Sequence, residues 1–173
     1  MPKKALLIIA PDKFRDEEYF HTKEELEATG VKVTTASSAS GEITGMLGGK
    51  AKPDKSLNDI KVDEYDAIVF VGGVGASAYF NNSQALEIAK KADKKGKVLA
   101  AICIAPTILA NAGVLKGKKA TLWGDPALIE NMKGKGGEYT GEPVTQDGKI
   151  ITGEGPNVAR NFGRAIAQTL KGE

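Results

Sequence analysis

The sequence is poor in cysteine and histidine and has little net charge. Its single cysteine excludes an internal disulfide and a cysteine-built zinc site, and its single histidine excludes most histidine-built metal sites. Lysine and arginine number 24 against 22 aspartates and glutamates, and the net charge of +2 is not that of a dedicated nucleic-acid binder. We therefore expect no metal site and no nucleic-acid partner.

Long apolar runs are also absent. The apolar run near the N-terminus covers only residues 5–10 and stops at Pro11. A secretory signal needs about 7–15 apolar residues and a membrane helix about 20. We expect a cytoplasmic protein that does not associate with membranes. Its 173 residues, 41% hydrophobic and 27% charged, predict a single globular domain over residues 1–173.

Strand and helix patterns alternate along the chain. Continuous apolar runs, typical of parallel strands buried on both faces, occupy residues 6–10, 31–36, 67–71 and 98–102. Helical patterns occupy residues 16–29, 84–95, 105–112, 126–132 and 158–170. Asp147-Gly148 predicts a hairpin, and the glycine-rich stretch 37–57 a smaller one. The order predicts an α/β fold, with a mostly parallel sheet covered by helices on both faces.

The only thiol stands where chemistry is expected in such a sheet. Cys103 follows the strand at 98–102, and ligands bind at the carboxyl ends of parallel strands. Pro106 suits the first turn of a helix, whose dipole would lower the thiol pKa below its free value of about 8.5. A buried structural cysteine fits the same residues equally well.

A glycine-rich loop follows the strand at 67–71. Gly72 and Gly73 could bring backbone N–H groups, together with the amide of Ile104, over Cys103 as an oxyanion hole. A plain tight turn is the alternative. The loop lacks the third glycine of a dinucleotide fingerprint, and Pro11-Asp12 follows the first strand in place of glycines. We therefore expect no nucleotide or other cofactor.

These motifs together resemble the ThiJ/PfpI family, which has the flavodoxin-like sandwich of class I glutamine amidotransferases. The family includes the Parkinson-disease-associated protein deglycase and PfpI-type intracellular proteases. The likeness runs over nearly the whole chain. It is carried by residues 14–18 (Phe-Arg-Asp-Glu-Glu), 72–73 (Gly-Gly), 101–106 (Ala-Ile-Cys-Ile-Ala-Pro), 112–117 (Ala-Gly-Val-Leu-Lys-Gly) and 153–156 (Gly-Glu-Gly-Pro).

The resemblance implies that Cys103 is the reactive residue and that Glu18 contacts its sulfur. Such a partner makes physical sense when Glu18 is protonated, because a carboxylic acid can donate a hydrogen bond to a thiolate whereas a carboxylate repels it. The two groups would then titrate as a coupled pair. The alternative is a solvated first-turn glutamate that complements the helix dipole.

Departures from the family pattern narrow the chemistry. Protease-like members follow the cysteine with histidine, where this chain has Ile104, and their acidic residue from a neighbouring subunit falls at Ser77. Peptidase activity is therefore disfavoured. Trp123 stands where the deglycase-like branch has a histidine. Its side chain either forms a wall of the pocket or packs in the core or at a subunit interface. His21, one turn after Glu18, is either a proton relay or a solvated surface residue.

The function predicted from the resemblance is attack by Cys103 on a small reactive carbonyl, with Glu18 as proton shuttle. The substrate would be a 2-oxoaldehyde or a glycated protein, as in a glyoxalase or deglycase. One alternative is a redox-responsive stress or chaperone-like protein whose Cys103 is oxidised to sulfinic acid. A PfpI-type cysteine peptidase is a further, disfavoured alternative. The family also implies a homodimer or a larger homo-oligomer.

Overall fold

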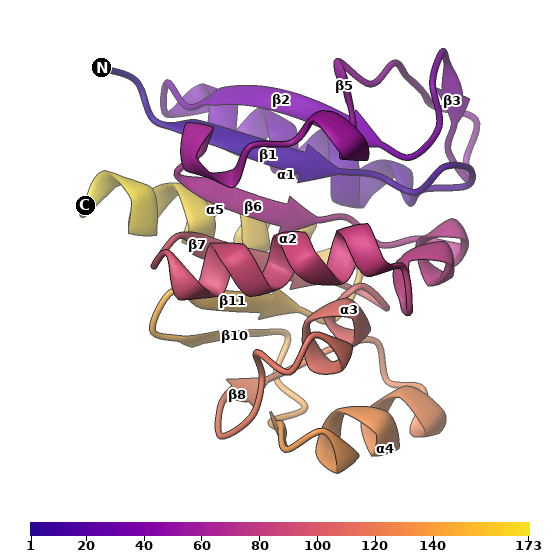
Figure 1. The fold of residues 1–173 in the computed structure, drawn as a ribbon, viewed down its shortest axis with the longest axis vertical. Coiled ribbons are helices and arrows are strands. Elements are labelled where there is room, and N and C mark those ends of the chain that lie inside the picture. Colours follow the sequence, from indigo (N-terminus) through magenta and orange to yellow (C-terminus); the bar gives the residue numbers. More distant parts are fainter.

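The computed structural model describes all residues from Met1 to Glu173 and places one seven-stranded sheet at the centre (Figure 1). The order is β10-β11-β7-β6-β1-β2-β5, and every neighbouring pair is parallel except β10 with β11. The strands of this sheet are β1 (Lys4–Ile8), β2 (Lys32–Ser37), β5 (Lys55–Ser56), β6 (Ala67–Phe70), β7 (Val98–Ile102), β10 (Val144–Asp147) and β11 (Ile150–Gly153). The predicted parallel sheet is therefore confirmed.

Helices cover both faces of the sheet. The helices are α1 (Asp16–Ala28), α2 (Ser83–Lys94), α3 (Pro106–Asn111), α4 (Pro126–Gly134) and α5 (Ala159–Lys171), with short 3-10 turns η1 (Leu57–Asp59), η2 (Val62–Glu64), η3 (Val74–Tyr79) and η4 (Pro156–Val158). In Figure 1, α2 lies in front of the sheet, with α1 and α5 behind it. This arrangement is the flavodoxin-like sandwich expected from the sequence.

Two hydrophobic clusters explain the layers. Alternate residues of the central strands join different clusters, because successive side chains of a strand point to opposite faces. Leu6 and Phe70 pack in the cluster that α2 and α3 complete, whereas Leu7 and Val69 pack with α1 and α5. Burial on both faces accounts for the unbroken apolar runs in these strands.

The remaining strands form two small ribbons at the periphery. The predicted hairpin in the glycine-rich stretch is β3 (Ile43–Thr44) antiparallel to β4 (Lys50–Ala51), and a second ribbon pairs β8 (Lys119–Ala120) with β9 (Glu138–Tyr139). No helix is both long enough and apolar enough to span a membrane. The cytoplasmic location stays a prediction.

Candidate functional site

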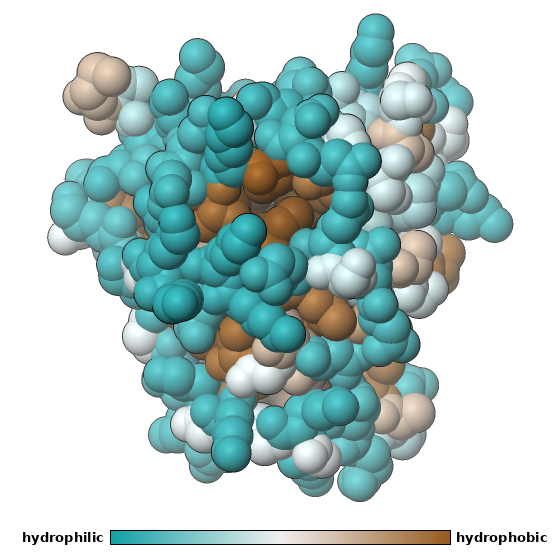
Figure 2. Space-filling view, viewed as in Figure 1, coloured by the Kyte–Doolittle hydropathy of each residue, from teal (hydrophilic) through white to brown (hydrophobic).

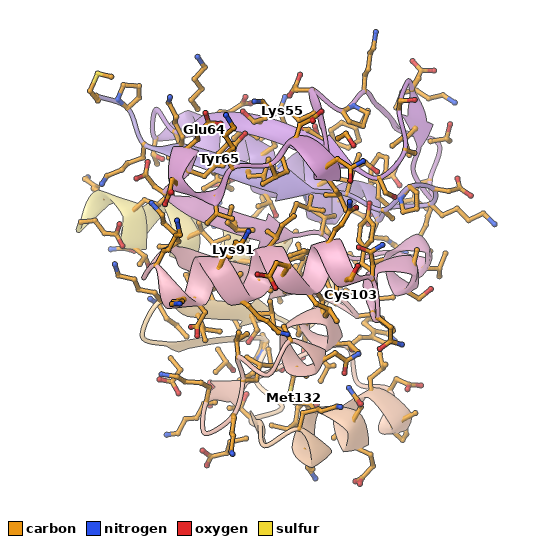
Figure 3. All side chains as sticks on the ribbon, in the orientation of Figure 1. Lys55, Glu64, Tyr65, Lys91, Cys103 and Met132 are labelled. Carbon is orange, nitrogen blue, oxygen red and sulfur yellow. The ribbon has the colours of Figure 1, made fainter.

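The only thiol lies on a strained turn at the carboxyl end of β7 (Figure 3). Cys103 has φ 64°, in the left-handed region that costs a non-glycine residue about 1–2 kcal/mol. Hydrogen bonds hold its backbone there: its N–H donates to the Gly153 carbonyl, and its carbonyl accepts from the Trp123 N–H, each at 2.9 Å. The turn thus fixes a half-buried sulfur between β7 and α3.

Glu18 reaches the same point from α1. Its side chain is fully buried, and it meets Cys103 across Gly72. A Cβ placed on Gly72 would lie 2.3 Å from Glu18 Oε1 and 2.7 Å from Cys103 Cβ. The carboxyl group and the cysteine side chain therefore lie against one glycine, and no larger residue fits between them.

The environment of Glu18 favours its protonated form. Burial raises the pKa of Glu18 from 4.5 to about 8, whereas the Cys103 side chain, the Arg15 charge and the Gly72 amide act to lower it. Neither carboxyl oxygen has a hydrogen-bond partner of ordinary geometry. A buried carboxylate without partners is costly, so the group keeps its proton to neutral pH.

The thiol pKa differs from the sequence-based expectation. Burial is the largest influence and raises the pKa of Cys103, as does the charge of a deprotonated Glu18, whereas the backbone amides of Ile104 and Gly73 lower it. The predicted lowering by the helix dipole alone is wrong, because α3 is only six residues long and the sulfur is largely removed from water. The two groups titrate as a coupled pair, and a protonated Glu18 removes the negative charge that contributes to the raised pKa of the thiol.

Backbone amides of the glycine loop influence the pKa of both members of the pair. The amide of Gly73 acts on the sulfur with that of Ile104, whereas the amide of Gly72 acts on Glu18. Of the three expected oxyanion donors, Gly73 and Ile104 therefore lie beside the thiol, whereas Gly72 lies beside the acid. A Cβ on Gly73, at φ 110°, would lie 2.3 Å from the backbone nitrogen of Arg15. The loop therefore packs against the start of α1.

The other two candidate site residues, His21 and Trp123, differ in how they relate to Cys103. His21 lies inside α1 and is half-buried, and its side chain makes no hydrogen bond, so none links it to the thiol. Trp123 is joined to Cys103 through its backbone N–H, and its side chain is 49% exposed. Packing of Trp123 in the core is therefore excluded.

Two residues near the site were given no role by the sequence. Arg15 forms an ion pair with Glu17 at 2.9 Å, and its charge acts on both Glu18 and Cys103. Asp16, buried beside them, accepts hydrogen bonds from the amides of Leu47 and Gly49 at 2.8 and 2.7 Å. The spacing Arg-x-Glu is a signal for the first contact, but nothing local in the sequence indicates the second.

The largest cavity lies away from the thiol. It measures about 770 Å³ and lies between α2 and the turns at Leu57–Glu64; Figure 2 shows it as a hollow with an apolar floor. Figure 3 labels Glu64 and Lys91 beside it and Cys103 at a distance. Its lining contains no cysteine and no histidine, and its one hydroxyl side chain is that of Ser83, which begins α2. No cluster of three or more His, Cys, Asp or Glu side chains that could hold a metal ion occurs in the protein.

The fold and this turn define a class, the α/β sandwich proteins that carry cysteine at a strained strand-to-helix elbow. Comparison with known proteins gives the family. The chain belongs to the DJ-1/PfpI family, whose model matches residues 3–169.

Similar proteins cover nearly the whole chain. An uncharacterized protein of Methanocaldococcus jannaschii is 43% identical over 97% of this chain and 82% of its own length. A Pyrococcus furiosus protein named deglycase PfpI is 33% identical over 96% of this chain and 99% of its own. The crystal structure of a ThiJ/PfpI domain protein from Brachyspira murdochii superposes with a TM-score of 0.95, at 28% identity, covering 100% of this chain and 99% of that one.

Proposed function

We propose that this protein is a cysteine-dependent enzyme for small reactive carbonyls, with Cys103 as nucleophile and Glu18 as proton shuttle. The observation that carries the proposal is the buried, unpartnered Glu18 carboxyl, which lies against the same glycine as Cys103. The name deglycase of the Pyrococcus furiosus relative supports this class of substrate. The substrates are 2-oxoaldehydes such as methylglyoxal, or their adducts with amines.

The first step forms a bond between the sulfur and the aldehyde carbon. The thiol releases its proton to solvent water as the sulfur attacks, the electron pair of the carbonyl π bond moves to oxygen, and Glu18 donates the proton that makes the neutral hemithioacetal and is left as a carboxylate. Gly73 and Ile104 have amides that face the sulfur and are placed to stabilise the developing oxyanion. A carboxyl whose pKa is about 8 can both give and take a proton near neutral pH.

The second step moves a proton within the adduct. The Glu18 carboxylate removes the hydrogen from the former aldehyde carbon and returns a proton to the neighbouring carbon. The first carbon is thereby oxidised to a thioester while the second is reduced to an alcohol, so no external oxidant is needed. Water then cleaves the thioester, releasing a 2-hydroxy acid (lactate from methylglyoxal) and regenerating the thiol. From an amine adduct, the sulfur attacks the carbon that bears the nitrogen, the C–N bond breaks as Glu18 protonates that nitrogen, and the free amine leaves with the oxoaldehyde transferred to sulfur as the same hemithioacetal.

Ile104 favours this chemistry over peptide cleavage. Hydrolysis of a peptide requires a group that protonates the leaving amine, a role that histidine performs in cysteine peptidases. Ile104 has no titratable group, and the His21 side chain makes no hydrogen bond. Carbonyl addition and rearrangement need only the one acid that faces the thiol.

The test is lactate formation from methylglyoxal by the purified protein. We expect the wild type to form lactate, and Cys103→Ala and Glu18→Gln each to lose at least about 100-fold in rate, as removal of a nucleophile or general acid does. His21→Asn is the matched control on α1 and should keep its activity. Equal turnover by wild type and Cys103→Ala would refute the proposal.

A redox role is the second candidate, because Cys103 is only partly buried and the backbone amides of Gly73 and Ile104 lie beside its sulfur. Peroxide would convert the thiol to sulfenic acid plus water, and a second equivalent would convert that to sulfinic acid. Intact mass after graded peroxide tests it. Uptake of two oxygens by wild type but not by Cys103→Ser, together with no lactate formation, would favour this role.

A homo-oligomer is our proposal for the assembled protein. Met46, Leu47 and Val74 are exposed apolar residues, and the Met46 sulfur accepts a hydrogen bond from the Val74 N–H at 3.5 Å. This patch adjoins the glycine loop, where contact with a second copy would cover the edge of the site. Light scattering should give a dimer or larger mass for the wild type and a smaller mass for Leu47→Lys. Monomeric wild type would contradict the proposal.

A further inference from the structure

The largest cavity has no part in the proposed reaction, yet its size is that of a binding site. We call it the α2 hollow, because α2 forms one wall and residues 57–64 form the other. Its volume of about 770 Å³ is within the range of small-molecule sites. At one end Lys95 pairs with Asp63 at 2.6 Å, and at the other the Gln84 side chain donates a hydrogen bond to Asn58. The two walls are therefore joined at both ends of the hollow.

The floor of the α2 hollow is the outer surface of the hydrophobic core. Leu57, Val62 and Ile88 line it, and all three belong to the core cluster that α2 and α3 complete. Ile60, also in the lining, is half-buried and packs against the same cluster. Figure 2 shows this apolar floor at the bottom of the hollow, within a hydrophilic rim. The floor favours an apolar group, because contact between them removes both surfaces from water.

The rim of the α2 hollow has more unpaired positive charge than unpaired negative charge. Lys61 and Lys91 stand on opposite walls, and the side chain of neither forms an ion pair or a hydrogen bond. The acidic residues of the rim are mostly paired: the aspartate at the joined end binds its lysine, and Glu64 lies 3.9 Å from Lys55. Only Glu87 has no partner. Two free cations against one free anion favour a ligand that carries negative charge.

We infer that the α2 hollow binds a small amphipathic anion, an apolar chain or ring that carries one negative group such as a carboxylate. The apolar part lies on Leu57, Val62 and Ile88, and the anionic group lies between Lys61 and Lys91. Burial of the apolar part provides the affinity, and the two lysines fix the orientation. None of these residues takes part in the proposed reaction, so the inference is independent of the proposed function.

The binding test uses octanoate, octylammonium and butanoate, with amide chemical shifts of the nitrogen-15-labelled protein as the readout. We expect octanoate to shift amides of α2 and of residues 57–64 saturably, with a Kd of about 1 mM. Octylammonium, of opposite charge, and butanoate, with its shorter chain, should each bind at least about tenfold more weakly. If either of them binds as tightly as octanoate, or if octanoate shows no saturable shifts at this place, the inference is overturned.

Substitutions of exposed residues on α2 test the part played by charge. Lys91→Gln should weaken octanoate binding about threefold, whereas Glu87→Gln should strengthen it about threefold, because the one unpaired negative charge of the rim is removed. Lys90→Gln is the matched control: Lys90 is the exposed neighbour of Lys91 but does not line the hollow, so the Kd should not change. Equal weakening by Lys90→Gln and Lys91→Gln, or weaker binding by Glu87→Gln, would overturn the inference. Cys103→Ala should bind octanoate like the wild type, so loss of lactate formation and loss of octanoate binding are separate results.

Discussion

The proton held by Glu18 should make stability fall with rising pH. The Glu18 carboxyl has a pKa of about 8 in the folded protein because it is buried, compared with 4.5 for an ordinary glutamate. Between these two values the folded state binds a proton that the unfolded state has released. The contribution is fully present below pH 4.5 and is lost as pH rises through 8. Glu18→Gln has a neutral group of the same shape at every pH, so it should remove this dependence.

The size of the effect follows from the shift. Each pKa unit corresponds to about 1.4 kcal/mol, so the raised pKa of Glu18 destabilises the wild type by up to about 5 kcal/mol between pH 4.5 and 8. In a protein of this length, 1 kcal/mol moves Tm by about 2–4 °C. Glu18→Gln should therefore melt close to the wild type at pH 4.5 and about 10–20 °C above it at pH 8.

Thermal unfolding followed by circular dichroism across this pH range is the assay. Glu17→Gln is the matched control, since Glu17 is one residue away but partly exposed and paired with Arg15, which lowers its pKa. The contribution of Glu17 is lost only as pH falls below its ordinary range, so this variant should follow the wild type between pH 5 and 8. If the Tm difference between Glu18→Gln and wild type is the same at pH 5 and pH 8, Glu18 is not held protonated.

Backbone geometry gives further predictions. Lys13 is exposed and has φ 54°, in the left-handed region that glycine adopts without strain. Lys13→Gly should therefore raise the unfolding free energy by about 1 kcal/mol in urea titrations. The control, Lys23→Gly, lies inside α1 and should lower the unfolding free energy by about 1 kcal/mol. A loss of stability in Lys13→Gly would contradict the strain. Gly73→Ala should lower the unfolding free energy by more than about 3 kcal/mol, because the added Cβ would lie 2.3 Å from the backbone nitrogen of Arg15. Gly134→Ala is the control, since its Cβ would enter open space at the end of α4, and it should leave the unfolding free energy unchanged or raise it. Similar urea midpoints for the two alanine variants would refute the steric argument.

The strands and the elbow could be predicted from the sequence because local signals determine them. Unbroken apolar runs require two covered faces, and β7 was predicted at Val98–Ile102 as the structure has it. The Asp147-Gly148 turn likewise specified the β10–β11 hairpin. The predicted ends of the other strands and helices differ by one or two residues, since terminal hydrogen bonds depend on the neighbouring loops.

Three consecutive acidic residues have different surroundings in the structure that local sequence signals do not predict. Asp16, Glu17 and Glu18 begin α1 and all suit a helix N-terminus. In the structure Asp16 binds the amides of the β3–β4 loop, Glu17 pairs with Arg15, and Glu18 is buried against Gly72. Which of the three faces the interior depends on how the start of α1 packs against the glycine loop that follows β6, a long-range contact that charge patterning does not encode. The family resemblance indicated Glu18 as the partner of Cys103, but only the structure shows that Glu18 is buried.

The glycines of the loop after β6 have a different structural role from the one that their pattern suggests. Paired glycines after a strand predict close approach of a ligand, yet the atoms a Cβ would meet at Gly72 and Gly73 belong to the chain itself. At Gly75 the Cβ would overlap the carbonyl oxygen of Asp12, at 1.6 Å. These residues let the β1–α1 connection pack against the β6 loop, and that packing brings Glu18 within reach of Cys103. The loop is therefore required first to assemble the acid–thiol pair, and its amides can serve a reacting carbonyl only because the pair is already in place.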